Sequence, residues 1–297
     1  MQIQSLSICV PAGCPNDCKF CVSKMKRGLY SNQIEGNNAF RDLYKRDFKT
    51  RLEFARDNGC NTMVFTGDGE PLANRKFLED VLEWNQHIQS PFRHVDLQTS
   101  GVGLVDCQTE PGSPQPVLRW LRNAGITTIA LSVSSLRDEV NAEYNGTPES
   151  RRICIKRVCD EIKRYDFNLR LSLNMTDYYD TFSASDLFAA LKALKANQVT
   201  FRILYESDNK TPQNKWIRKH KASDDVHGKI LHHIHECGRK LERLPFGAWR
   251  YAVNDMSVVI DDDCMSTADD KDVIRYLVLR PDCRLYSKWD EKGSLIF

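Results

Sequence analysis

The segment Ile3–Cys21, IQSLSICVPAGCPNDCKFC, joins a short, mainly apolar run to three closely spaced cysteines. The first part, Ile3–Val10, predicts a buried β-strand. Cys14, Cys18 and Cys21 follow it with the spacing C-x3-C-x2-C. Thiolates are the standard ligands of iron–sulfur clusters, so we expect a metal centre directly after the first strand.

Outward from this segment, short apolar runs alternate with stretches of helical period, which predicts parallel β/α units. The further predicted strands are Asn61–Phe65, His94–Gln98, Thr127–Val133, Asn168–Leu173 and Val199–Tyr205. The predicted helices are Asn37–Asn58, Arg75–Ile88, Gln115–Asn123, Glu149–Tyr165 and Ser185–Asn197, the last with Ser185 as its N-cap. Six such units predict an α/β fold, a partial (β/α)6 TIM-like barrel, whose chemistry sits at the carboxyl ends of the strands.

The pattern changes at about Asp208. A polar, basic loop precedes a long predicted helix, Asp224–Arg243. Two antiparallel strands are predicted at Trp249–Ile260 and Val273–Leu279, and a third around Arg284–Trp289. We therefore expect a core of residues 1–206 and a C-terminal α+β extension, residues 207–297, that closes the barrel mouth.

The composition is typical of a globular protein, since 28% of the 297 residues are charged and 41% are hydrophobic. No apolar run reaches the roughly 20 residues that a transmembrane helix needs, and the N-terminus lacks the features of a secretory signal. We therefore expect a cytoplasmic protein without a membrane partner. Eleven cysteines in such a chain indicate metal binding or buried thiols rather than disulfides.

Three cysteines would leave one iron of a 4Fe–4S cluster without a protein ligand, and cofactor chemistry requires such an open position. A structural zinc site needs four ligands. The nearest fourth candidate, Cys9, lies within the first predicted strand. The pattern favours an iron–sulfur cluster, with a zinc-bound binding module as the competing interpretation.

The cysteine motif, with Phe20 directly before its last cysteine, resembles the signature of the radical S-adenosylmethionine (SAM) superfamily. Gly69-Glu70-Pro71, after the second predicted strand, is similar to that family's Gly-Gly-Glu-Pro motif, with Asp68 in place of the first glycine. The resemblance extends over the core, from about Ile3 to Tyr205.

The resemblance implies a role for each of nine residues. Cys14, Cys18 and Cys21 would bind three irons, while SAM chelates the fourth. Gly67, Gly69 and Glu70 would line the site of the SAM amino group, Phe20 would lie near the adenine, and Ser132 and Asn174 would supply further contacts to SAM.

The family's chemistry is a reductive cleavage of SAM to a 5′-deoxyadenosyl radical, which removes a hydrogen atom from a substrate. It implies an external one-electron reductant such as flavodoxin or ferredoxin. Whether SAM is consumed or regenerated stays open. The different-class alternative is a non-catalytic iron–sulfur protein for electron transfer or sensing.

Two predicted loops at the open side of the barrel are basic, which predicts a small anionic or nucleotide-like substrate. Their cations are Lys24, Lys26, Arg27, Lys210, Lys215, Arg218, Lys219 and Lys221. The alternative is an RNA or protein substrate, because an open barrel admits macromolecules. The turn Gly69–Asn74 also looks like that of RNA-methylating radical SAM enzymes, which carry a methyl group on a cysteine, but for Cys264 and Cys283 an inert thiol is favoured.

Overall fold

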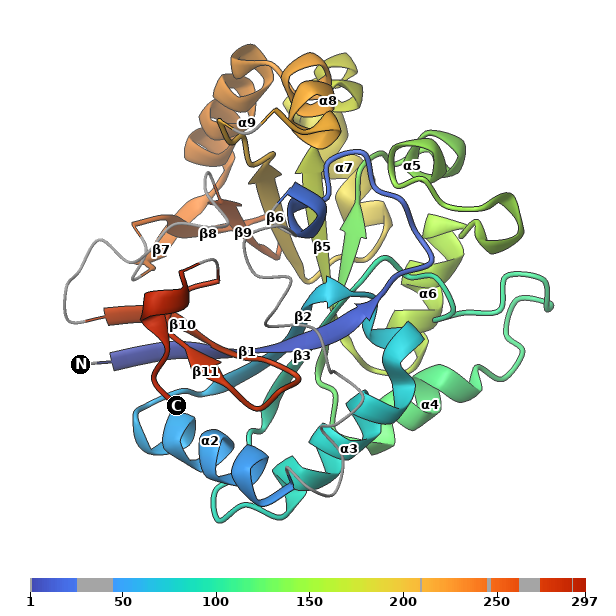
Figure 1. Cartoon of the computed structure of the whole chain (residues 1–297). Coiled ribbons are helices and arrows are strands. Elements are labelled where there is room, and N and C mark those ends of the chain that lie inside the picture. The colour runs from blue at the N-terminus through green and yellow to red at the C-terminus, as the bar shows by residue number, and fades with distance from the viewer. Residues whose placement is uncertain (1, 26–44, 209, 245–246, 262–272, 290) are drawn as a thin grey trace.

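The computed structural model describes residues 2–25, 45–208, 210–244, 247–261, 273–289 and 291–297. One curved sheet of eleven strands forms the centre of the molecule, and the helices lie mainly on its outer side (Figure 1). The strands follow one another across the sheet in the order β11-β10-β1-β2-β3-β4-β5-β6-β9-β8-β7.

The strands are β1 (Gln2–Gly13), β2 (Thr62–Gly69), β3 (His94–Thr99), β4 (Thr128–Val133), β5 (Asn168–Met175), β6 (Gln198–Ile203), β7 (Arg239–Arg243), β8 (Trp249–Val253), β9 (Met256–Asp261), β10 (Val273–Leu279) and β11 (Leu285–Tyr286). The α-helices are α2 (Lys45–Asp57), α3 (Arg75–Gln86), α4 (Pro116–Asn123), α5 (Asp138–Tyr144), α6 (Ile155–Arg164), α7 (Ala184–Ala193), α8 (Pro212–His220) and α9 (Asp224–Cys237). Short 3-10 turns are η3 (Pro71–Asn74), η4 (Glu149–Arg151), η5 (Asp177–Thr181) and η6 (Lys292–Ser294).

Eight neighbouring strands, from β10 through β1–β6 to β9, run parallel. The six predicted β/α units are therefore confirmed. In the described part of the chain β11 and β7 are the two edges, so the sheet is not closed. The extra parallel strand on each side comes from the C-terminal third of the chain, which thereby joins the same sheet as the core. The division into domains at residue 206 stays a prediction.

Alternation along the strands explains where the core and the site lie. On β4 and β5, the apolar residues Leu131 and Leu171 are buried in the main hydrophobic core. Polar residues alternate with them on the opposite face of the sheet, where Ser132 and Asn174 line a cavity. Because side chains of a strand alternate between faces, the sheet packs its apolar face against the helices and turns its polar face inward.

Two predictions for the C-terminal third are wrong in part. The helix predicted over Asp224–Arg243 ends at Cys237, because Gly238 is extended and the next residues pair with β8 as strand β7. The strand predicted over Trp249–Ile260 is a hairpin of β8 and β9. Its turn residues, Asn254 and Asp255, have φ values of 49° and 66°, as a tight two-residue hairpin turn requires.

The predicted strand Val273–Leu279 is β10, but its pairing is not the one expected. It runs parallel to β1, whereas only the short β11 is antiparallel to it. An apolar run does not reveal which distant strand it will join, so the pattern alone favoured a local antiparallel pair.

Among the core helices, the predicted segment Glu149–Tyr165 divides into η4 and α6, with extended residues between them. The carboxylate of Asp138 accepts a hydrogen bond from the Ile155 amide at the start of α6 (3.0 Å). Helix α7 is capped by Ser183, not Ser185, since the Ser183 hydroxyl accepts from the Asp186 amide. Helices α5 and α8 were not predicted.

Helix α2 is the described part of the helix predicted over Asn37–Asn58; residues 37–44 lie outside the described ranges. Within the ranges that are described, no helix combines the length and the apolar character needed to cross a membrane.

Candidate active site

The predicted cluster loop, Cys14–Cys21, follows β1 and is held on two sides by backbone hydrogen bonds. On one side the Glu70 amide donates to the Gly13 carbonyl (2.9 Å). On the other, the Asp17 amide donates to a carbonyl just after α5 (3.1 Å), and the Lys19 amide donates to the carbonyl of the last residue of α5 (3.0 Å). The loop conformation is therefore set by β2 and α5 as well as by its own sequence.

The three thiols influence one another electrostatically. Burial is the largest cause that raises the pKa of Cys14 and of Cys18, and the charge of neighbouring cysteines raises both further. Among the described residues, no three Cys, His, Asp or Glu side chains converge closely enough to hold a single metal ion. The donor set fits a 4Fe–4S cluster, in which each thiolate binds a different iron and the positive charge of the metal offsets the repulsion.

The side chain of Asn16, in the same loop, is a second indication that the loop binds a further group. Its side-chain amide is 6% exposed and has no hydrogen-bond partner in the described part of the chain. Buried polar groups in proteins are nearly always hydrogen-bonded. The loop therefore fits an arrangement in which it encloses a further polar group.

The carboxyl end of β2 and the residue after it, Gly67–Glu70, form a glycine-rich turn that requires glycine at two positions. A Cβ atom on Gly67, whose φ is +118°, would lie 2.7 Å from the Cys9 sulfur. A Cβ atom on Gly69 would lie only 2.0 Å from the carbonyl oxygen of Pro11. No other residue type allows this close approach between the turn and β1. The turn and the cluster loop are thus built against the same strand.

The carboxylate of Glu70 accepts hydrogen bonds from residues at the end of the neighbouring strand, β3. One oxygen accepts from the Thr99 hydroxyl (2.6 Å) and, more weakly, from the Leu72 amide, and the other accepts from the amide and hydroxyl of Ser100 (2.9 and 2.8 Å). Burial raises the pKa of Glu70, and these hydrogen bonds oppose that rise. Glu70 therefore ties β2 to β3, and its contact with SAM stays a prediction.

Asn74, at the end of η3, was not predicted as a site residue. Its side-chain amide donates to the carbonyls of Pro11, Gly13 and Glu70 (3.2, 3.4 and 3.0 Å). It thereby joins the end of β1, which leads into the cysteines, to the glycine-rich turn. Its place directly after Gly-Glu-Pro-Leu-Ala is the only sequence signal for this role.

A cavity of about 470 Å³ opens on the inner face of the sheet, beside the cluster loop. Six of the nine predicted residues line it: Phe20, Cys18, Cys21, Gly67, Ser132 and Asn174. The amide of Asn174 donates to the Ser132 hydroxyl across β5 and β4 (3.0 Å). The structure thus brings together residues from four separate parts of the sequence. Cys14, Gly69 and Glu70 do not line this cavity.

Sequence analysis missed the residues of the far wall of the cavity, which come from β6 and β10. Arg202 lies next to Asn174 in strand register, and Arg275 and Tyr276 come from the other end of the sheet. In the described part of the chain no carboxylate pairs with Arg202, and its Nε is buried without a hydrogen-bond partner. A charged residue within the apolar run of β6 was the available signal.

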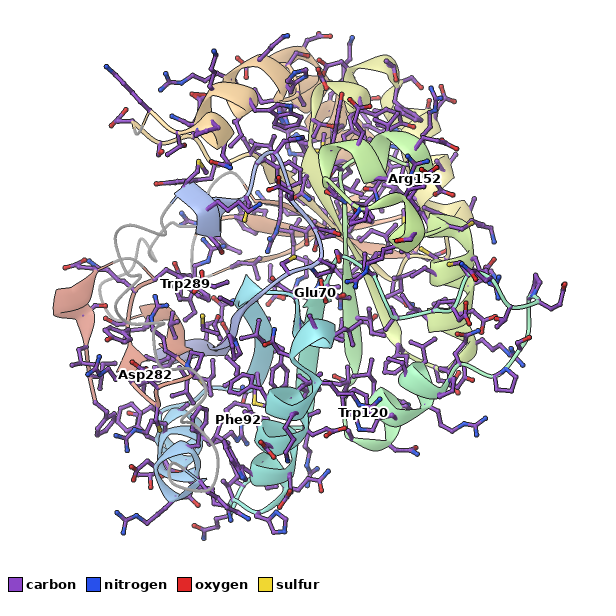
Figure 2. The ribbon with its side chains drawn as sticks, turned by 45° about the vertical axis from the view of Figure 1, so that its right-hand side comes forward. Glu70, Phe92, Trp120, Arg152, Asp282 and Trp289 are labelled. Carbon is purple, nitrogen blue, oxygen red and sulfur yellow. The ribbon has the colours of Figure 1, made fainter. Side chains whose placement is uncertain are left out.

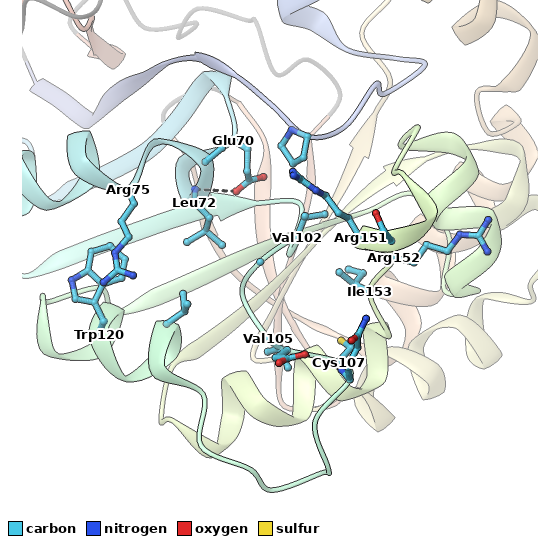
Figure 3. A pocket seen from close by; sticks show the side chains of 17 residues that line it. Glu70, Leu72, Arg75, Val102, Val105, Cys107, Trp120, Arg151, Arg152 and Ile153 are labelled. Atoms are coloured by element: carbon cyan, nitrogen blue, oxygen red, sulfur yellow. Dashed lines mark hydrogen bonds between the residues drawn. The ribbon is translucent and has the colours of Figure 1, made fainter.

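A second cavity, of about 430 Å³, lies between the glycine-rich turn, the segment after β3 and the segment before α6 (Figure 3). Glu70 and Leu72 lie on one side of it, with Cys107 and Ile153 on the other. None of the three predicted cluster cysteines lines this cavity. Glu70 lies near the centre of the molecule (Figure 2) and lines the second cavity but not the first. Cys18 and Cys21, two of the predicted cluster ligands, line the first cavity.

Helix α8 covers the cluster loop. The ring of Trp216 packs against Phe20 (5.9 Å between centroids) and Tyr144 (5.1 Å), and stacks on His220 (4.6 Å). Asp177 accepts from the Tyr144 hydroxyl and pairs with His220, both at 2.8 Å. These contacts fix α8 over Phe20, the residue predicted to lie near adenine.

The predicted basic loops are partly neutralised. Lys24 pairs with Asp17. Glu206 pairs with both Arg218 (3.5 Å) and Lys221 (2.7 Å), and the Lys221 hydrogen bond lowers the pKa of that carboxyl. Lys26, Arg27 and Cys264 lie outside the described residues. Cys283 lies in the turn between β10 and β11, and burial raises its pKa to about 12, as expected of an inert thiol.

The fold is a partial (β/α) barrel, and the residues predicted to bind the cofactors lie at the carboxyl ends of its strands. Residues 8–180, more than half of the chain, match the family model of the Radical SAM superfamily, and the chain belongs to this superfamily. Its cofactors are a 4Fe–4S cluster and SAM. No curated protein sequence matches the chain significantly.

Solved structures show the same fold. The chain is similar to native anSMEcpe with bound AdoMet (TM-score 0.60, 16% identity, 99% of this chain and 77% of that one). It is also similar to anSMEcpe with AdoMet and the Cp18Cys peptide (0.51, 16%, 80% and 59%). A third similar structure is the radical SAM enzyme coproporphyrinogen III oxidase, HemN, from Escherichia coli (0.52, 15%, 80% and 54%). The match thus covers little more than half of the chain in each of the last two structures.

Proposed function

We propose that this chain cleaves SAM reductively at a cluster held by Cys14, Cys18 and Cys21, and that the resulting radical takes a hydrogen atom from a small anionic substrate. The observation that carries the proposal is the cavity, which joins the cluster loop to a polar wall that includes Arg202. An external one-electron carrier of the flavodoxin or ferredoxin type would supply the electron.

In this proposal each group of residues has a distinct task. The three thiolates hold the cluster, and the backbone of the Gly67–Glu70 turn, with Ser132 and Asn174, orients SAM. When bound, the cluster and SAM supply the one-electron bond cleavage that the protein side chains cannot perform. Phe20, with helix α8 behind it, excludes water from that side of the cavity.

The anionic character of the substrate is inferred from Arg202. A guanidinium that no described carboxylate neutralises favours a carboxylate or phosphate in the same cavity. The exterior loops contribute less than their sequence suggests, because Asp17 and Glu206 neutralise several of their cations. A peptide substrate is the second candidate, supported by the peptide bound in one structure of similar fold.

The test is anaerobic. The protein is reconstituted with iron and sulfide, reduced with dithionite and given SAM, and 5′-deoxyadenosine is quantified by chromatography. We expect product from the wild type and loss of product from Cys18→Ala. Cys107→Ala, at a partly exposed cysteine of the second cavity, is the matched control and should retain activity. A cluster that forms and never cleaves SAM would favour the electron-transfer or sensor alternative.

The substrate class is tested by a second variant. Arg202→Met should still cleave SAM slowly without substrate. It should lose the stimulation that nucleoside monophosphates, or another anionic probe, produce in the wild type. Equal stimulation of both proteins would contradict the proposed role of Arg202.

A further inference from the structure

Arg280, directly after β10, is the largest fully buried side chain in the described part of the protein. Its guanidinium pairs with the carboxylate of Asp68 (3.6 Å) and contacts the Cys9 sulfur (3.9 Å). It also donates to the carbonyl of Trp289 and lies near the rings of Tyr286 (5.5 Å) and Trp289 (5.9 Å). Arg280 thus connects the C-terminal segment to the glycine-rich turn.

Asp68 is the residue at which this chain departs from the Gly-Gly-Glu-Pro pattern. It lies between Gly67 and Gly69, and its side chain is 5% exposed. The Cys9 thiol, whose pKa burial raises far above its ordinary value, remains protonated and donates to the same carboxylate (3.4 Å). The Asp68 carboxylate therefore has one partner in β1, Cys9, and another in the C-terminal segment, Arg280.

Removal of one partner from such a pair has a larger effect than removal of both. A buried carboxylate left without its cation is strongly destabilised, whereas replacement of both charges by neutral groups can be nearly neutral. The turn has little freedom to adapt, because the space at Gly67 and Gly69 is already filled by β1. A displaced Asp68 must therefore shift the backbone of the whole turn.

We propose that Arg280 is a positioning residue which, through Asp68, holds the Gly67–Glu70 turn in the conformation that binds SAM. This inference rests on the proposed function of that turn. It assigns a further task to the C-terminal segment: besides lining the cavity with Arg275 and Tyr276 of β10, the segment supports the glycine-rich turn through Arg280. Figure 2 shows Trp289, which packs against Arg280, on the side of the molecule where these strands lie.

The test compares Arg280→Met, Arg280→Lys and the double variant Asp68→Asn with Arg280→Met. Arg284→Met is the matched control, since Arg284 lies in the same hairpin, is 55% exposed and pairs locally with Asp282. For each reconstituted protein we would measure iron content, the dissociation constant for SAM by calorimetry, and the SAM-induced change in the electron paramagnetic resonance spectrum of the reduced cluster. Amide hydrogen exchange at residues 67–70 is followed in the protein without cluster.

We expect Arg280→Met to keep its iron and to bind SAM at least 10-fold more weakly, with faster exchange at residues 67–70. Arg280→Lys should be intermediate, the double variant should recover most of the affinity, and Arg284→Met should match the wild type. SAM affinity unchanged in Arg280→Met, or equally weak in the single and double variants, would overturn the proposal. If the wild type itself fails to bind SAM, the proposed function fails. The exchange data then still decide whether Arg280 fixes the turn.

Discussion

Gly69 illustrates how single residues define the site. Its missing side chain lets the glycine-rich turn lie against Pro11 and Gly13 of β1, the strand that leads into the cysteines. Glu70, the next residue, joins the turn to Thr99 and Ser100 at the end of β3. Two adjacent residues therefore connect three strands at the point where the cofactors are expected.

Gly69→Ala should prevent the turn from forming, because the new Cβ would overlap a backbone oxygen that cannot move aside. We expect a loss of about 3 kcal/mol or more in the free energy of unfolding, measured by urea denaturation of the protein without cluster. Gly228→Ala is the control. Gly228 lies in helix α9 with open space around it, so alanine should leave stability unchanged or raise it by up to about 1 kcal/mol.

Glu70→Gln should lower the free energy of unfolding by about 1–3 kcal/mol, because one acceptor oxygen is replaced by an amide that faces hydrogen-bond donors. The deficit should depend on pH. Burial raises the pKa of Glu70 above its ordinary value of 4.5, so its stabilising contribution is full below that pH and is lost as pH rises through the folded-state pKa. Denaturation from pH 4.5 to 8 should therefore show the deficit shrinking. A constant deficit would contradict the shift.

Cys283 should resist alkylation in the native protein. With a pKa of about 12, its thiolate fraction at pH 8 is about 10⁻⁴, and the side chain is buried. Mass spectrometry after brief treatment with iodoacetamide should find Cys237, which is exposed on α9, modified long before Cys283. Equal rates at the two positions would show that the turn between β10 and β11 opens readily.

At the residue scale, sequence analysis identified the cysteine and glycine motifs but not the residues that hold these motifs in position. The cysteines, Gly67 and Gly69 could be predicted because their residue types are tied to local spacing and to a known family pattern. Asn74 and Arg280 act through contacts with segments far away in the chain. Such contacts depend on the packing of distant strands, which no local pattern encodes.

Among the elements, helix α8 has the most direct connection to the site. It covers the cluster loop through Trp216, and His220 at its end pairs with Asp177. Its sequence, PQNKWIRKH, is mostly polar, so it carries little apolar periodicity and was interpreted as a loop. Thr211, which accepts a hydrogen bond from the Asn214 amide, was the available N-cap signal.

Trp216→Ala should loosen α8 without unfolding the protein, because it removes ring contacts with Phe20, Tyr144 and His220. We expect amide exchange within residues 212–220 to become about 10-fold faster, corresponding to about 1.4 kcal/mol of local opening free energy. Trp120→Ala, on α4 next to Arg75 and away from the cluster loop, is the control and should leave α8 unaffected. Unchanged exchange in both variants would contradict the role of Trp216.

The strands show the same limit of sequence-based prediction. β2 to β6 were found because each is a short apolar run between turn signals and helical segments. The pairings of β9 with β6 and of β10 with β1 were not found. An antiparallel hairpin is a local event, whereas a strand that joins the far side of a sheet is selected only by the finished fold.

At the scale of the whole molecule, β1 is a central strand only because β10 covers it. β1 carries the cysteine loop at its carboxyl end and pairs with β2 on its other side. Without the C-terminal strands it would be a long, largely apolar edge strand, which is a known aggregation hazard.

A chain that ends at Asp261 should therefore aggregate, because it exposes the β1 edge. The measurement is the soluble fraction after lysis, followed by size-exclusion chromatography. Co-expression of residues 262–297 as a separate segment is the control and should restore part of the solubility. A truncated chain that is soluble and monomeric would show that β10 is dispensable for the fold.

The pairing of β1 with β10 also determines when, during synthesis, the sheet around the cysteine loop is complete. The cysteine loop leaves the ribosome before β10, which is made about 260 residues later. At about 5–20 residues per second this delay is roughly 13–50 seconds. Until then the strand that bears the cluster loop lacks one neighbour, and Asp68 lacks Arg280. We therefore expect iron to be loaded only after β10 has been made and has paired with β1.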